Sequence, residues 1–576
     1  MPSPIPAISE DYSDIIVKKQ LLPFRIEERY QEQPVDRQYS ILYAPLSENL
    51  YAAHQIGYIS VPKLYTFISL SSLERSGILS AQTQPYLRLL GTGILIGFLD
   101  SGIDYRHPAF RKADGTTRIA ALWDQSDSTG IAPEGFSYGS EYQEDAINQA
   151  LFSEEPYRIV PSHDFDGHGT AVAGIACGSA DPEADFTGAA PDSTLAVVKL
   201  KPAKQYLRDY FLIPDDATAF QENDLMLGIR YLIDTAIRLR MPLVICISLG
   251  SNQGSHTGNT PLEEVLSSAL LLGGTYVVAG TGNEAGMSHH YYGKLNRAAE
   301  SAELELLIRD ASKGVTLEFW AEPLELYDIG FTSPLGESIQ PTYYGPFSYR
   351  EFTFALENTK IYVYYSALEL STGQQVIQIR IEHPSTGIWR LHVVNRSYIN
   401  GSFHLWLPIT GLSSPGTFFT APNPDTTLVI PSCASSLLSV AAYDADSNRL
   451  FLNSGRGYTQ NEIIKPDLAA PGVSVTAPVA GGGYEAFTGS CAASALTAGA
   501  TALLAQGGAA NASTPHLHRT TGQNAVPAWE PAKQRLCLSE PGMGLWHPGF
   551  VPYIRIDCIT QNFFLNLFNR QAYDTL

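Results

Sequence analysis

Short apolar runs alternate with helix-patterned segments over two stretches of the chain, residues 85–293 and 431–506. In the first stretch the apolar runs are residues 93–99, 194–200, 243–249 and 275–279. In the second, a strand-like run is followed by a helix of small residues. Apolar strands that alternate with helices are typical of a parallel sheet flanked by helices. We therefore predict one α/β unit that is encoded in two parts.

The segment between those parts, residues 294–430, has a different pattern. Short runs rich in Tyr, Phe, Thr and Val are separated by turn residues, as at 315–320, 360–365, 375–381 and 387–394. This pattern predicts an all-β, jelly-roll-like sandwich inserted into the α/β unit. Residues 1–75 alternate short apolar strands with turns that contain proline, which predicts a small α+β unit.

Composition narrows the classes of partner and compartment. The 576 residues include 58 Asp and Glu against 37 Lys and Arg, a net charge of −21, which disfavours nucleic acid and anionic membrane as partners. No apolar run approaches the roughly 20 residues that span a bilayer. Because no signal peptide is visible, we expect cytoplasmic synthesis. The six cysteines are widely spaced and form no Cys-x-x-Cys pair, so we expect no disulfide scaffold and no metal site.

Four positions could carry chemistry, and each has a plain alternative. Asp100 ends an apolar strand, where a carboxylate can be catalytic, a metal ligand or a cap. His168 lies between two glycines at a predicted helix start, a place where no packing reason favours His. Asn283 follows a strand, where its amide can face an oxyanion or simply form the turn. The pair Ser490 and Cys491 opens the small-residue helix, which suits a nucleophile and also an ordinary N-cap.

The order of these residues along the chain resembles that of the subtilisin-like serine peptidases of family S8. The motifs Asp-Ser-Gly-Ile at 100–103 and Gly-His-Gly-Thr at 167–170 are similar to the Asp and His motifs of that family. The resemblance implies that Asp100 orients His168, that His168 is the general base, and that Asn283 stabilises the oxyanion. It implies no cofactor.

A second group of residues resembles the place where such peptidases hold their substrate. Ser248, Leu249 and Gly250 resemble the strand edge that binds a peptide by β-augmentation. Residues 65–69 resemble the end of a propeptide that lies in this groove, and we expect the prodomain to end between residues 65 and 85. The partners implied are a protein or peptide substrate and the protein's own prodomain.

The nucleophile motif departs from the family pattern, and two alignments compete. Ser490 could be the nucleophile, or Cys491 could occupy the position of the family's serine. The second alignment keeps Gly489 two residues before the nucleophile, Ala493 two after and Gly499 eight after. The alignment with Ser490 as the nucleophile needs an extra residue in the helix, and one extra residue would turn the packed face of that helix by about 100°. We therefore favour Cys491 and predict weak or absent peptide hydrolysis, because sulfur sits farther from Cβ than oxygen does.

The layout as a whole looks closest to the Csp germination proteases of spore-forming bacteria. That resemblance implies a peptidase that removes its own prodomain and then activates a cortex-lytic hydrolase zymogen, with packaging in the spore. The alternative is a catalytically inactive pseudoprotease that regulates an active relative. Cys491 favours this alternative, whereas the intact Asp100, His168 and Asn283 favour the enzyme.

The final segment, residues 507–576, lacks the closing helix and the Trp-Gly-Tyr-Gly-like turn of the family. Read one base later, the codons of Met543-Gly544 contain a Trp codon and those of Trp546-His547 contain a Gly codon. We interpret this segment as atypical and frameshifted, with a divergent natural tail as the alternative.

Overall fold

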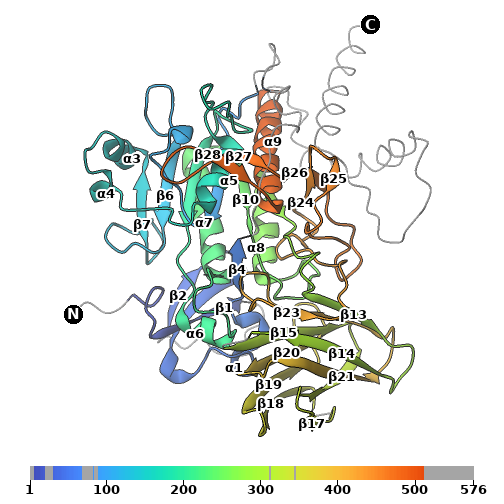
Figure 1. Ribbon diagram of the computed structural model, residues 1–576. Coiled ribbons are helices and arrows are strands. Elements are labelled where there is room, and N and C mark those ends of the chain that lie inside the picture. Colours follow the sequence, from blue (N-terminus) through green and yellow to red (C-terminus); the bar gives the residue numbers. More distant parts are fainter. Residues whose placement is uncertain are drawn as a thin grey trace, which may run out of the picture.

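The computed structural model describes residues 5–19, 30–67, 82, 89–310, 313–342 and 345–511 (Figure 1). Its central sheet has nine strands in the described part of the chain, in the order β25-β24-β12-β10-β5-β8-β6-β7, with β26 paired to β24. Their bounds are β5 (Leu95–Asp100), β6 (Ile119–Asp124), β7 (Ser140–Gln143), β8 (Thr194–Lys199), β10 (Leu243–Ile247), β12 (Thr275–Gly280), β24 (Leu438–Asp444), β25 (Arg449–Leu450) and β26 (Leu468–Pro471).

The sheet is mixed rather than wholly parallel. Strands β6, β8, β5, β10, β12, β24 and β26 pair in parallel, as the sequence pattern predicts. The edge strands β7 and β25 are antiparallel to their neighbours β6 and β24, so the expectation of a parallel sheet is corrected at both edges. The physical reason is that each edge strand follows its neighbour directly in the chain without a crossover helix.

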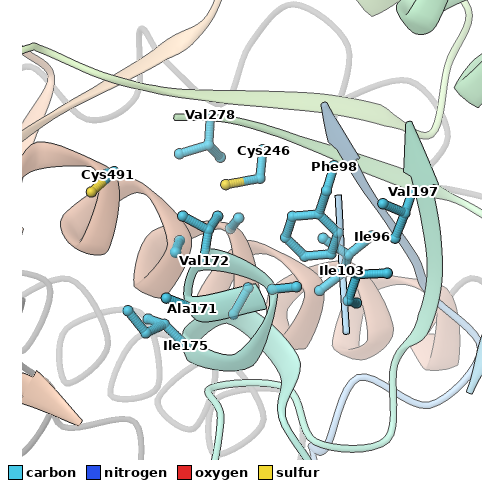
Figure 2. Packing of buried hydrophobic residues seen from close by; sticks show 14 of the residues in the cluster. Ile96, Phe98, Ile103, Ala171, Val172, Ile175, Val197, Cys246, Val278 and Cys491 are labelled. Carbon is cyan, nitrogen blue, oxygen red and sulfur yellow. The ribbon is translucent and has the colours of Figure 1, made fainter. Parts of the chain in front are cut away.

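Both faces of the sheet are buried, because alternate side chains of each strand point to opposite faces. On β5, Ile96 and Phe98 belong to one apolar cluster, and Leu95 and Leu99 belong to another. Helices α5 (His168–Cys177) and α9 (Ser490–Asn511) pack in the first cluster, and α7 (Glu222–Leu239) and α8 (Pro261–Leu270) pack in the second. Figure 2 shows Phe98 and Cys491 toward opposite sides of the first cluster, with Cys246 and Val172 between them.

Helices α5 and α9 approach each other closely. A Cβ atom at Gly499 of α9 would overlap the backbone oxygen of Ala176 of α5 and the side chain of Ala189. The small residues that the sequence places along α9 therefore allow contact between backbones. This contact limits how α9 can rotate about its axis relative to α5.

Residues 290–419 form two antiparallel sheets, drawn at the bottom of Figure 1. One has the order β13-β22-β15-β20-β19-β18 and the other the order β17-β16-β21-β14-β23. Their bounds are β13 (His290–Lys294), β14 (Ser301–Ile308), β15 (Gly314–Ala321), β16 (Leu326–Thr332), β17 (Ser338–Ile339), β18 (Phe347–Phe354), β19 (Thr359–Ser366), β20 (Gln375–Glu382), β21 (Gly387–Ser397), β22 (Ser402–Trp406) and β23 (Thr417–Phe419). Side chains of both sheets, among them Phe319 and Leu391, share one apolar cluster.

The N-terminal region forms a small sheet of its own and then joins the α/β unit. Strands β1 (Tyr12–Lys18), β3 (Tyr39–Pro45) and β2 (Gln31–Pro34) pair in that order, and α1 (Ala53–Ile56) follows. A buried ion pair of 2.6 Å between Asp14 Oδ1 and Lys204 Nζ ties this sheet to the α/β unit. Strand β4 (Leu64–Phe67) is not part of this small sheet. It lies between β11 (Leu249–Gly250) and β9 (Phe220–Gln221) in a separate three-stranded sheet.

Three further α-helices and one hairpin belong to the described part of the chain. They are the helices α3 (Glu144–Leu151), α4 (Pro156–Ile159) and α6 (Gln205–Tyr210), and the hairpin of β27 (Val475–Pro478) and β28 (Tyr484–Phe487), which leads into α9. No helix in the ranges given above combines the length and hydropathy needed to cross a membrane. Residues 512–576, which include most of the predicted atypical tail, lie outside the described residues.

Candidate active site

The end of β5 and the start of α5 bring an acid and a histidine together. Asp100 is the last residue of β5, and His168 is the first residue of α5 after Gly167 in a left-handed conformation. The Nδ1 of His168 lies 2.7 Å from Oδ1 of Asp100, and both side chains are almost fully buried. Gly169 has room only for hydrogen, because a Cβ there would overlap the backbone oxygen of Gly102. The glycines that flank His168 in the sequence thus allow α5 to begin against the turn after β5.

The surroundings of His168 favour its protonated form. Burial alone would lower the pKa of the imidazole, but the charge of Asp100, its hydrogen bond and the Cys491 thiol together raise that pKa to about 10. In the described part of the chain, Nε2 of His168 is buried and has no hydrogen-bond partner with ordinary geometry. The thiol therefore acts on the ring as a neighbour in the site and not through a well-formed hydrogen bond.

The first turn of α9 separates the two candidate nucleophiles. The Oγ of Ser490 accepts a hydrogen bond of 2.9 Å from the backbone N–H of Gly282, and the backbone N–H of Ser490 donates to Oδ1 of Asn283 at 3.2 Å. The Ser490 hydroxyl is thus occupied by the turn that carries Asn283. The geometry favours Cys491 as the residue that faces His168. Asp100, His168, Asn283 and Cys491 are brought to one place from β5, α5, the end of β12 and α9.

A carboxylate that our sequence analysis did not single out holds the Asn283 turn. Glu284 is buried, and its Oε2 lies 2.7 Å from Nδ1 of His289 and accepts a hydrogen bond from Asn252. Its Oε1 accepts the backbone N–H of Thr410 at 3.1 Å. Burial would raise the pKa of Glu284, but His289 and Thr410 lower it, so the carboxylate stays charged. The sequence gives one signal for this role of Glu284, its position next to Asn283. The contact with Thr410 could not be read from the sequence, because the two residues are 126 positions apart.

The strand edge predicted to bind a peptide is occupied by the protein's own chain. Leu249 and Gly250 pair antiparallel with Phe67 and Thr66 of β4. The ring of Phe67 stacks on that of His168, with centroids 4.2 Å apart and planes inclined by 23°. Ser248 precedes β11 and is buried, and the residues that follow Phe67 lie outside the described part. Residues 65–67 therefore lie where the sequence analysis placed the end of a propeptide.

Comparisons with known proteins agree with this geometry. The chain matches the subtilase family model over residues 91–301 and 412–544. The gap in that match, residues 302–411, covers most of the two antiparallel sheets. The match also continues into the segment that the sequence analysis treats as atypical.

Individual relatives differ in how much of their length the chain covers. The structure of the Clostridium perfringens CspB protease is similar, with a TM-score of 0.69 and 32% sequence identity, over 84% of this chain and 97% of that one. The PII-type proteinase of Lacticaseibacillus paracasei is 24% identical over 469 residues, which are 72% of this chain and 22% of the relative. The subtilisin-like protease SBT2.2 of Arabidopsis thaliana is 32% identical over 107 residues, 17% of this chain and 12% of the relative. The chain thus spans a minor part of these two curated relatives.

The family match covers more than half of the chain, and the matched residues include β5, α5, β12 and the start of α9, which carry the candidate site. The chain therefore belongs to the subtilase family and is a subtilisin-like serine peptidase of the Csp type.

Proposed function

We propose that the protein is an endopeptidase that cleaves its own prodomain, residues 1–75, and then a protein substrate. The observation that carries this proposal is that β4 lies in the groove as an added strand, with Phe67 stacked on His168. A peptide held in this way presents the bond that follows Phe67 to the catalytic residues. We expect the cut within a few residues after Phe67.

Each residue of the site has a role in this reaction. Asp100 holds His168 through the 2.7 Å hydrogen bond and stabilises the imidazolium that forms when His168 has taken the proton of the nucleophile. The imidazolium later donates this proton to the leaving amine. Asn283 stabilises the oxyanion of the tetrahedral intermediate. Cys491 is the nucleophile, at the start of α9.

The thiol is expected to impair this peptidase. A C–S bond is longer than a C–O bond, so the attacked carbonyl is displaced from Asn283, and a misplacement of about 1 Å can cost roughly 100-fold in rate. For the substrate, we propose a cortex-lytic hydrolase zymogen cleaved during spore germination, after cytoplasmic synthesis and packaging in the spore. The similarity to the CspB protease supports this choice. We also propose that residues 294–430 are a jelly-roll-like insertion in the catalytic domain.

The test is the intact mass of the purified protein beside its Cys491→Ser variant, each made with and without the restored reading frame after Gln506. Cys491→Ala is the matched control, because it has no nucleophile at this position. We expect a cut after Phe67 in the Ser variants and none in the Ala variant. A folded Ser variant that stays uncut in both reading frames would contradict the proposal and favour the pseudoprotease, a regulatory binding protein.

A further inference from the structure

The carboxylate of Glu284 connects three parts of the molecule. Glu284 directly follows Asn283 in the turn after β12. Its Oε2 accepts a hydrogen bond of 3.2 Å from Nδ2 of Asn252, which lies just beyond β11, the strand edge that pairs with β4. Oε2 also lies 2.7 Å from Nδ1 of His289, which precedes β13, and Oε1 accepts the backbone N–H of Thr410 at 3.1 Å. The Asn283 turn, the peptide-binding edge and the two antiparallel sheets therefore meet at one carboxylate.

The partners of Glu284 are also bonded to one another. Nδ2 of Asn252 donates a second hydrogen bond of 3.2 Å to the backbone oxygen of Leu407, the residue that follows β22. The backbone N–H of Leu407 donates to the backbone oxygen of His289 at 2.9 Å. These bonds close a network in which Asn252 and His289 hold the same carboxylate and the same peptide group. The members of such a network support one another, so none of them moves alone.

The charge of Glu284 keeps this network together. Glu284 is 3% exposed, and burial would raise its pKa, but the charge of His289 and the hydrogen bonds from His289 and Thr410 lower that pKa. The carboxylate is therefore ionised although it is buried. A buried charge is strongly destabilising unless its donors stay in place. The ionised Glu284 thus ties its own backbone firmly to its three partners.

The residue on the other side of Asn283 is held by α9. The backbone N–H of Gly282 donates to Oγ of Ser490 at 2.9 Å, and Oδ1 of Asn283 accepts the backbone N–H of Ser490. Because Oδ1 faces α9, the nitrogen of the same amide group points away from Ser490. Gly282 and Glu284 therefore anchor the backbone on both sides of Asn283, and the direction of its amide depends on both anchors.

We propose that Glu284 is a positioning residue, which holds the side-chain amide of Asn283 at a fixed distance from a peptide paired with β11. The proposal rests on the proposed peptidase function, because it assumes that Asn283 stabilises an oxyanion. An oxyanion donor must lie about 2.7–3.1 Å from the developing charge, and a displacement of about 1 Å can cost roughly 100-fold in rate. Strand β11 holds the peptide, and Asn252 ties the end of that strand to Glu284. Substrate and donor are thus held against the same strand.

The test is a double-mutant cycle on the rate of prodomain cleavage. Full chains that carry Cys491→Ser are kept unfolded and uncut in urea, and the cut after Phe67 is followed by intact mass after dilution. Glu284→Gln keeps the size of the side chain but places an amide N–H₂ where donors converge, and should slow the cut about tenfold or more. Asn283→Ala should slow it about 100-fold or more. If Glu284 acts through Asn283, the double variant should match Asn283→Ala within about twofold.

Two further variants separate positioning from a general loss of stability. Glu325→Gln is the matched control, because Glu325 is also fully buried and accepts the backbone N–H groups of Asn400 and Gly401, and it should leave the cut rate unchanged. If Glu284→Gln does not fold, His289→Gln takes its place in the cycle, since it removes one partner of Glu284. Losses that multiply in the double variant, or an equal loss in Glu325→Gln, would overturn the proposal.

A measurement without turnover distinguishes failure of the proposal from failure of the peptidase function. A folded Cys491→Ser protein that stays uncut contradicts the peptidase function alone. In that case, hydrogen exchange of the backbone of residues 281–287 is followed by mass spectrometry with and without Glu284→Gln. About tenfold faster exchange in this segment, with β5 unchanged, supports the anchoring of Asn283 by Glu284. Equal exchange in the two proteins would overturn it.

Discussion

The ring of Phe67 is expected to control access to the Cys491 thiol. The thiol is fully buried, and the strand that ends in Phe67 lies over the neighbouring His168. Phe67 also contacts Phe220 edge-on, with ring centroids 5.6 Å apart. A reagent that reacts with thiols can reach Cys491 only when this end of β4 opens. Replacing Phe67 with Ala removes both ring contacts and leaves the backbone pairing with Leu249 in place.

The size of the effect follows from the contacts that are lost. An aromatic pair contributes about 0.5–1.5 kcal/mol beyond the burial of its area, and a half-buried Phe contributes about 1–1.5 kcal/mol more through that burial. Allowing for partial collapse around the shortened side chain, Phe67→Ala should favour the open state by about 2 kcal/mol. That free energy corresponds to an approximately 30-fold larger open population. If opening is rapid compared with alkylation, the labelling rate rises by the same factor.

The assay is the rate of alkylation of Cys491 by iodoacetamide under native conditions, followed by peptide mass analysis. Cys246 of β10 is buried in the same apolar cluster and serves as an internal control for global unfolding, since it should stay unlabelled in both proteins. Phe152→Ala is the matched substitution, because Phe152 is 71% exposed and follows helix α3, which is not part of the groove. A change of less than threefold in Cys491 labelling by Phe67→Ala, with Cys246 protected, would refute the idea that β4 covers the thiol.

Three further predictions concern stability, measured from urea unfolding curves. Folding raises the pKa of His168 to about 10, so the pairing of His168 with Asp100 stabilises the folded state fully below pH 6.5. As the pH rises from 6.5 toward 10, the free energy of unfolding should fall by up to ~1.4 kcal/mol per pH unit. Asp100→Asn should flatten this dependence of stability on pH, and an unchanged dependence would contradict the prediction. Gly499→Val should lower the free energy of unfolding by about 1–3 kcal/mol, because its side chain would overlap Ala176. Gly508→Val should not have this effect, because nothing lies within 4 Å of a Cβ at Gly508. Burial lowers the pKa of His290 to about 3, so on acidification His290 is protonated in the unfolded chain before it is protonated in the folded one. The free energy of unfolding should therefore fall below pH 6.5 by up to ~1.4 kcal/mol per pH unit, and His290→Gln should reduce that loss.

The sequence predicted the central elements well because their patterns are local. The apolar run that ends at Asp100 is strand β5, and the small-residue segment that begins at Ser490 is helix α9. A parallel strand buried on both faces has a continuous apolar run, which is readable without knowledge of its neighbours. The antiparallel edge strands were not predicted, since β7 and β25 are short and half-exposed, and little in their composition separates them from loops.

Long-range contacts explain what the sequence could not predict in the site. The hydrogen bonds of Glu284 come from Asn252, Thr410 and His289, and the first two lie far away in the chain. The contact between the loop after β5 and the β27–β28 hairpin is similar, because Asp104 and Gly481, which are joined by a hydrogen bond, are 377 residues apart. No pattern of period 2 or 3.6 records such pairs, whereas the motif around His168 is local and was recognisable.

The choice between Ser490 and Cys491 shows how packing remote from the chemistry fixes a catalytic position. Gly499 packs against Ala176, and a Cβ at this position would overlap the Ala176 oxygen, so this contact limits how α9 can rotate. In the observed rotation Ser490 accepts the N–H of Gly282, and the Cys491 thiol lies close enough to His168 to raise the pKa of that ring. Ser490 donates its backbone N–H to the Asn283 turn, a role that does not depend on the identity of the next side chain. We propose that Cys491 occupies the position of the family's serine, so that sulfur replaces oxygen as the reacting atom. Since the Asp100–His168 hydrogen bond and the hydrogen bonds between Ser490 and the Asn283 turn are in place, we expect Cys491→Ser to restore hydrolysis without a compensating substitution in the described part of the chain.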